Sequence, residues 1–84
     1  MMKIQLKLYA SLGQYLPPEA KKNEIEVDVH DSATVGEVLR QFTVPNEMCH
    51  LVLVNGVFVP PGERDRLAFK DGDTLAVWPP VAGG

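Results

Sequence analysis

The sequence predicts an α+β fold in which one main helix packs against a mixed sheet of about four to five strands. Three observations support this. Segments of alternating apolar residues lie toward both ends of the chain, one central segment has helical periodicity, and 84 residues suffice for a single core. Hydrophobic residues make up 45% and charged residues 23% of the chain, so a packed domain is expected rather than disorder.

Two antiparallel strands are expected first. Apolar residues alternate with Lys and Gln over residues 3–8, and with Glu, Asp and His over residues 24–30, which is typical of half-buried strands. Acidic side chains of the second strand can face lysines of the first, which favours antiparallel pairing. Residues 10–23 contain glycine and a proline pair and are expected to form a surface loop. Three of its side chains are expected to fold back onto the core: Leu12, Tyr15 and Leu16.

A helix is expected to begin at Thr34. Thr34 and Glu37 have the spacing of a capping box, in which each side chain satisfies a free backbone N–H group of the other residue. The following residues place one apolar stripe at helical spacing: Val35, Val38, Leu39 and Phe42. Pro45 cannot continue the helix, so about two to three turns are predicted.

The second half of the chain predicts a hairpin and, after it, two apolar side chains that pack in the core. Strands are expected over residues 51–54 and 57–59, because Asn55-Gly56 tolerates the positive φ angles of a two-residue hairpin turn. Leu67 and Phe69 are then expected to fill the core. A tight turn is predicted at residues 71–73, whose sequence is Asp-Gly-Asp.

The last strand is expected at residues 74–78 and ends at Pro79, because proline cannot donate to a strand ladder. Alternation directs Leu75 and Val77 toward the helix and Trp78 toward the opposite face. The resulting order of elements is the β-grasp arrangement, in which the first and last strands lie side by side and parallel in the sheet centre.

Charge and cysteine content exclude several classes of function. Eight Lys and Arg against eleven Asp and Glu give a net charge of -3, without the basic excess that nucleic acid or an anionic membrane requires. Cys49 is the only cysteine, so no internal disulfide can form, and a reducing, cytoplasmic location is expected. The longest apolar run, residues 51–54, is far too short to span a bilayer, and no targeting segment is expected.

Few residues are arranged for catalysis. His30 and His50 belong to different elements, and no carboxylate has ligand spacing near them, so neither a metal site nor a bound cofactor is expected. A thiolate–imidazole pair at Cys49 and His50 is disfavoured, because adjacent residues of a strand point to opposite faces. Three aspartates are interpreted as turn residues that cap backbone groups: Asp65, Asp71 and Asp73. The chain alone is therefore not expected to be an enzyme.

The strongest functional signal is the tail, residues 79–84, which follows a globular domain of residues 1–78. Gly83 and Gly84 lack side chains and follow a stiff proline pair, so the terminal carboxylate can enter a channel too narrow for any Cβ atom. An extended tail of this length reaches about 20 Å, enough to enter a partner's active site. A terminal Gly-Gly alone would be weak support for such a function, because chain ends are commonly Gly-rich and mobile.

The ending Pro79-Pro80-Val81-Ala82-Gly83-Gly84 resembles that of the molybdopterin synthase small subunit (MoaD) family of ThiS-like, ubiquitin-like sulfur carriers. The resemblance covers the whole chain. It implies that an ATP-dependent activating enzyme adenylates Gly84 and that a sulfur donor converts it to a thiocarboxylate. It also implies a heterotetramer with the synthase large subunit, which holds the catalytic residues and receives sulfur for a molybdenum or tungsten cofactor.

Trp78 is assigned to the partner-docking surface, because a large aromatic side chain facing solvent just before the tail would otherwise be unusual. Alternatives stay open. A ubiquitin-like modifier that forms isopeptide bonds with lysines shares the fold, the tail and the adenylation step, and a related carrier can serve thiamine synthesis or tRNA thiolation. A β-grasp binding domain with an incidental Gly-Gly ending is disfavoured, because nothing in the predicted sheet suggests a ligand pocket.

Overall fold

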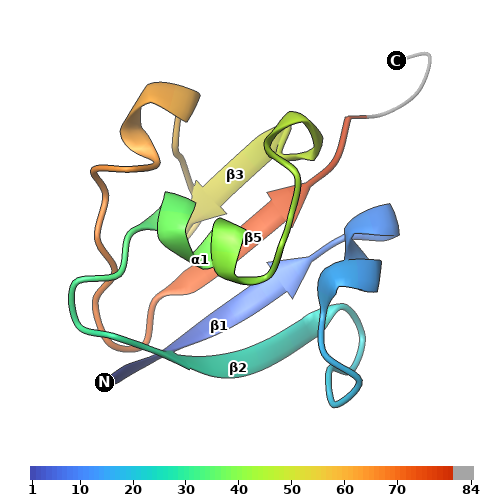
Figure 1. Cartoon of the computed structure of the whole chain (residues 1–84), viewed down its shortest axis with the longest axis horizontal. Helices are drawn as coiled ribbons and strands as arrows, with labels where there is room; N and C mark the ends of the chain where they lie inside the picture. The colour runs from blue at the N-terminus through green and yellow to red at the C-terminus, as the bar shows by residue number, and fades with distance from the viewer. Residues whose placement is uncertain (81–84) are drawn as a thin grey trace.

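Five strands form one mixed sheet in the order β2-β1-β5-β3-β4, and the helix α1 packs across one of its faces (Figure 1). This computed structural model describes residues 1–80. The strands are β1 (Met2–Leu8), β2 (Glu24–Val29), β3 (Leu51–Val54), β4 (Val57–Phe58) and β5 (Thr74–Trp78). The helix α1 spans Val35–Gln41, and 3-10 helices lie at η1 (Ala10–Tyr15), η2 (Asn46–Met48) and η3 (Pro61–Glu63). The predicted β-grasp class is confirmed.

The centre of the sheet is the pair that the sequence predicts. β1 runs parallel to β5 and antiparallel to β2. Within the β1–β2 pair, Lys3 lies opposite Asp28, and its Nζ is 2.8 Å from the Asp28 carboxylate. Lys7 lies opposite Glu24, so the expected matching of a basic and an acidic strand is confirmed.

The core lies between the sheet and α1. Its most completely buried side chains come from alternate positions of β1 and β5, from the apolar stripe of α1, and from η1 and β3. Each is 1% exposed or less: Ile4, Leu6, Leu8, Leu12, Val35, Val38, Val52, Leu75 and Val77. Alternation within each strand sends the intervening side chains to the other face of the sheet, which no helix covers in the described part of the chain.

The start of α1 confirms one half of the predicted capping box. The Thr34 hydroxyl accepts a hydrogen bond from the Glu37 backbone N–H at 3.2 Å. The return bond differs from the prediction: the Glu37 carboxylate accepts from the Thr34 hydroxyl at 3.3 Å and lies 3.1 Å from Nε2 of His30. An exposed imidazole within reach competes for the carboxylate, which therefore does not bind the backbone as expected.

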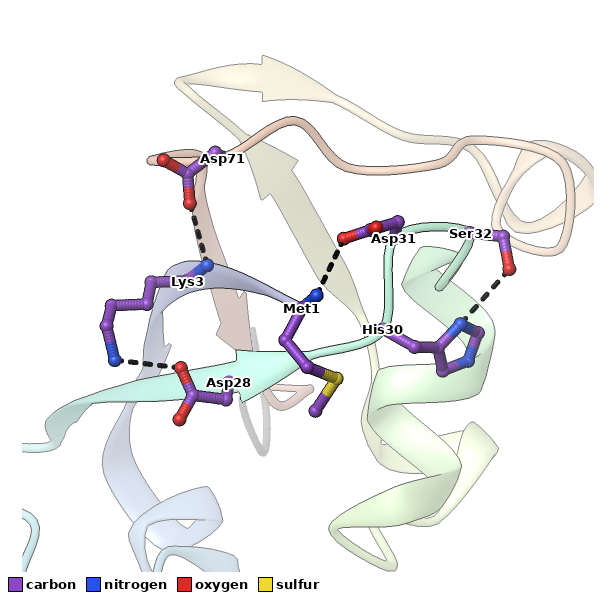
Figure 2. A network of polar contacts seen from close by, with 7 residues as sticks. All are labelled: Met1, Lys3, Asp28, His30, Asp31, Ser32 and Asp71. Carbon is purple, nitrogen blue, oxygen red and sulfur yellow. Dashed lines mark hydrogen bonds and ion pairs between the residues drawn. The ribbon is translucent and has the colours of Figure 1, made fainter.

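The end of β1 at which the chain begins is held by a polar network (Figure 2). The Asp71 carboxylate accepts from the Lys3 backbone N–H at 2.8 Å, and the terminal amine of Met1 lies 3.1 Å from Asp31. Gly72 has a φ of +89°, and the Asp73 carboxylate accepts from the Lys70 N–H at 2.8 Å. The predicted turn at residues 71–73 and the capping role of Asp73 are confirmed. Asp71 differs from the prediction, because its carboxylate binds the backbone of Lys3 on β1 and not a neighbouring group of its own turn.

Two predictions about connecting segments need revision. The loop after β1 contains η1, yet Leu12 is buried and Tyr15 and Leu16 pack on the core, as expected. Phe69 is buried, but Leu67 is 39% exposed, so its predicted place in the core is wrong. Leu67 closes the turn after η3, where its N–H donates to the Glu63 carbonyl at 3.0 Å, and this turn leaves its side chain at the surface.

The hairpin between β3 and β4 has the predicted turn. Asn55 and Gly56 have φ angles of +51° and +83°, which suits a two-residue connection. None of the helices in the described residues is long and apolar enough to cross a membrane.

Candidate functional site

The base of the tail is fixed by both neighbours of β5. The Tyr9 N–H, just beyond β1, donates to the Val77 carbonyl at 3.0 Å, and the His50 N–H, just before β3, donates to the Trp78 carbonyl at 3.1 Å. Pro79 is buried and Pro80 is exposed. The other predicted tail residues, Val81, Ala82, Gly83 and Gly84, lie outside the described residues, so the role assigned to Gly84 stays a prediction.

Trp78 lies on the face of the sheet opposite α1, as alternation predicts. Its indole is half-buried rather than fully exposed, because the Tyr9 ring stacks on it with a centroid distance of 4.5 Å and an interplanar angle of 13°. Sequence reasoning missed Tyr9. The two rings meet because Lys7 pairs with Ala76 in the parallel ladder, and two residues further along both strands are Tyr9 and Trp78. The sequence predicts the parallel pair but not this register.

An apolar surface continues from Trp78 across the uncovered sheet face. Trp78 lies opposite Leu51, and Leu53 lies between Ala76 and Phe58 in the strand ladders. Leu51 is 37% and Phe58 50% exposed. We call this set the outer apolar face: Tyr9, Leu51, Leu53, Phe58, Ala76 and Trp78. Exposed apolar side chains gathered in this way are typical of protein-interaction surfaces.

The other half of the same sheet face is charged. It carries outward side chains of β1 and β2, among them Lys3 and Lys7 opposite Asp28 and Glu24. The uncovered face is therefore divided, with its apolar half beside the base of the tail and its charged half over β2. A partner that docks on the apolar half also meets the point where the tail leaves the sheet.

The thiol of Cys49 does not take part in a catalytic arrangement within residues 1–80. It is buried and lies 3.4 Å from the Pro45 carbonyl oxygen, and burial raises the pKa of the thiol, which favours its protonated form. His50 is exposed. In the same range, no group of three or more His, Cys, Asp or Glu side chains could hold a metal ion.

Asp65 also departs from its predicted capping role. Its carboxylate lies 2.9 Å from Nη1 of Arg40 in an exposed ion pair between α1 and the turn after η3. The guanidinium, a charged donor within reach, takes the place of a backbone N–H.

Solved structures share this architecture over nearly the whole chain. The HVO 2177 protein of Haloferax volcanii is 30% identical, with a TM-score of 0.76, covering 99% of this chain and 87% of its own. SAMP1, a small archaeal modifier protein of the same organism, is 28% identical, with a TM-score of 0.69 and coverage of 98% and 99%. Subunit 1 of the molybdopterin-converting factor of Helicobacter pylori, solved in complex with subunit 2, is 17% identical, with a TM-score of 0.61 and coverage of 99% and 100%, which shows a shared fold.

The five-stranded mixed sheet with its single α-helix defines a ubiquitin-like β-grasp protein. A family model described as Mut7-C ubiquitin matches residues 1–83, and the chain belongs to this family. No curated protein matches the sequence. The predicted resemblance to MoaD- and ThiS-like carriers is thereby confirmed.

Proposed function

We propose that this chain is the sulfur-carrier subunit of a molybdopterin synthase and that Gly84 carries the sulfur. The observation that supports this best is the outer apolar face, which ends where the chain enters the sequence Pro-Pro-Val-Ala-Gly-Gly. A partner docked on this face is placed to receive the tail. The synthase large subunit and an ATP-dependent activating enzyme are the proposed partners, acting in turn in the cytoplasm.

The proposed chemistry begins with a poor electrophile, the Gly84 carboxylate. One of its oxygens attacks ATP in the active site of the activating enzyme, pyrophosphate leaves, and an acyl adenylate forms. A sulfur donor then displaces AMP and leaves a C-terminal thiocarboxylate, which donates sulfur to a pterin precursor in the large subunit. This chain supplies no catalytic group, and its Gly-Gly ending removes the Cβ atoms that would obstruct both attacks.

The described residues contribute by holding and presenting the tail. The hydrogen bonds from Tyr9 and His50 to the last carbonyls of β5 hold the base of the tail in the sheet. The stacked rings of Tyr9 and Trp78 form a rigid aromatic anchor beside it. Aromatic side chains of this kind dominate binding energy when a partner covers them.

The alternative is a protein modifier that joins Gly84 to a lysine through an isopeptide bond. One observation favours it: the small archaeal modifier proteins are 23% to 28% identical to this chain, whereas the molybdopterin-converting factor structures are 17% and 23% identical. Adenylation and docking would be the same for both functions. They differ in what receives the activated glycine, a sulfur atom or a lysine amine. A carrier for thiamine synthesis is a variant of the first function.

The intact mass of the chain isolated from its native cells tests the proposal. A carrier is expected to include a form in which one terminal oxygen is replaced by sulfur, and this form should revert to the free acid when it is mixed with large subunit and pterin precursor. A chain without Gly84 is the matched control and should never gain sulfur. Recovery of the chain only as the free acid and as lysine conjugates would reject the carrier function and support the modifier.

A further inference from the structure

Arg64 is the one charged side chain that is buried among residues 1–80, at 6% exposure. Its Nη1 donates to the Cys49 carbonyl at 3.0 Å, and its Nε donates to the Val59 carbonyl at 3.3 Å. Its Nη2 is buried and has no hydrogen-bond partner in the described residues. A buried guanidinium with an unused donor and no bound carboxylate is costly, which points to an anionic partner.

The Arg64 side chain lines a pocket between α1 and the loops that carry η2 and η3. Its lining includes Gly36, Arg40, Asn46, Cys49, Arg64 and Asp65. Arg40 and Asp65 form their ion pair at this pocket, with side chains 65% and 69% exposed. A Cβ atom at Gly36 would collide with the Asp65 carboxylate, so the glycine leaves room for the pair against α1.

The pocket has two guanidinium groups and one carboxylate, and the carboxylate is the easiest of them to displace. An exposed ion pair contributes little stability, so Asp65 can release Arg40 at small cost. Arg40 and Arg64 would then face the pocket as two positive charges beside the Asn46 side chain. Two guanidiniums match a doubly charged oxyanion better than a single carboxylate, because each can donate charge-assisted hydrogen bonds to it.

We propose that this pocket binds a small divalent oxyanion, phosphate or sulfate, held between Arg40 and Arg64 in place of Asp65. Nη2 of Arg64, which has no partner among the described residues, supplies a donor for the anion, and Asp65 moves away from Arg40 as the anion binds. The site is built from α1, η2 and η3, separate from the outer apolar face. It therefore adds a ligand to the protein independently of the proposed carrier function.

The test is a ¹H–¹⁵N NMR titration of the full chain with inorganic phosphate, and separately with sulfate, at an ionic strength held constant with chloride. Saturable shifts are expected at the backbone amides of Gly36, Asn46 and Arg64 and at the Arg64 Nε–H. Acetate, a monocarboxylate, should bind more weakly than either dianion. Equal affinity for acetate, or shifts that do not saturate, would overturn the proposal.

Variants separate this site from general attraction of anions to the protein. Arg40→Gln should weaken phosphate binding about tenfold. Arg66→Gln removes the same charge from an exposed residue outside the pocket and should leave the affinity within about twofold. Asp65→Asn removes the competing carboxylate and should tighten binding up to about fivefold.

Arg64 itself is a poor test residue, because its bonds to two carbonyls support the fold. Equal losses in Arg40→Gln and Arg66→Gln would overturn the site, as would an unchanged or weaker affinity in Asp65→Asn. Retention of the wild-type amide spectrum away from the pocket shows that these surface variants are folded.

Discussion

Replacing Trp78 with alanine tests whether the outer apolar face binds the partners. The substitution removes the indole that Tyr9 stacks on at 4.5 Å. Loss of the stacking contact should lower the free energy of unfolding by about 1 kcal/mol, in addition to the loss of burial of half the indole. Small domains are stable by about 5 kcal/mol or more, so the variant should remain folded.

The effect on binding should be larger than the effect on folding. An aromatic anchor covered by a partner typically costs about 2 kcal/mol when it is truncated, which is a loss of affinity of about thirtyfold. Isothermal titration calorimetry with the activating enzyme or the large subunit measures this loss, and thermal unfolding measures the stability. Trp78 is the only tryptophan, so its fluorescence should also change when the partner binds.

Val57→Ala is the matched control for this experiment. Val57 is 68% exposed and lies on β4 beside Phe58, but alternation directs its side chain to the opposite face of the sheet. Its truncation should leave the affinity unchanged. Unaltered affinity in Trp78→Ala, together with a fluorescence spectrum that does not respond to the partner, would show that the docking surface lies elsewhere.

Four further changes have defined outcomes. Val38→Asp places an unpaired carboxylate at a fully buried position and should lower the free energy of unfolding by several kcal/mol. Glu37→Ala should lower it by about 1 kcal/mol or less. Denaturant titration measures both values, and equal effects would contradict the burial of this face of α1. Deleting Gly84 should leave the melting temperature nearly unchanged, because the core is complete by Val77, and should abolish thiocarboxylation; sulfur loading of the truncated chain would refute the transfer site. Iodoacetamide should label Cys49 slowly in the native protein near neutral pH, because the raised pKa keeps the buried thiol protonated. Labelling should be quick in denaturant. Fast labelling of the native protein would contradict the burial of this thiol.

The parts of the fold that could be predicted from the sequence are those that a short local pattern of residues determines. Alternation located β1, β2 and β5 because one face of each is buried against α1. The positive φ angles of Asn55 and Gly56 follow from residue types that tolerate them, so the hairpin was predictable without knowledge of its surroundings.

The errors arose where a contact between distant segments decides the structure. Leu67 has the apolar character of a core residue, but the turn after η3 leaves it at the surface. Tyr9 acquires its role only from the parallel pairing of β1 with β5. Arg64 looks like an ordinary exposed residue of a charged loop, and its burial depends on carbonyl groups of Val59 and Cys49 that its own sequence neighbourhood does not specify.

The central position of β5 has a mechanical consequence for the proposed function, in which a partner binds the C-terminal tail. A pull on the tail acts along β5, and the ladders to β1 and β3 on its two sides run across that direction. The hydrogen bonds of both ladders therefore share the load in shear and do not open one after another from an edge. If a partner draws the tail into a channel, as we propose, the folded domain is expected to stay intact and to stop at the mouth of that channel.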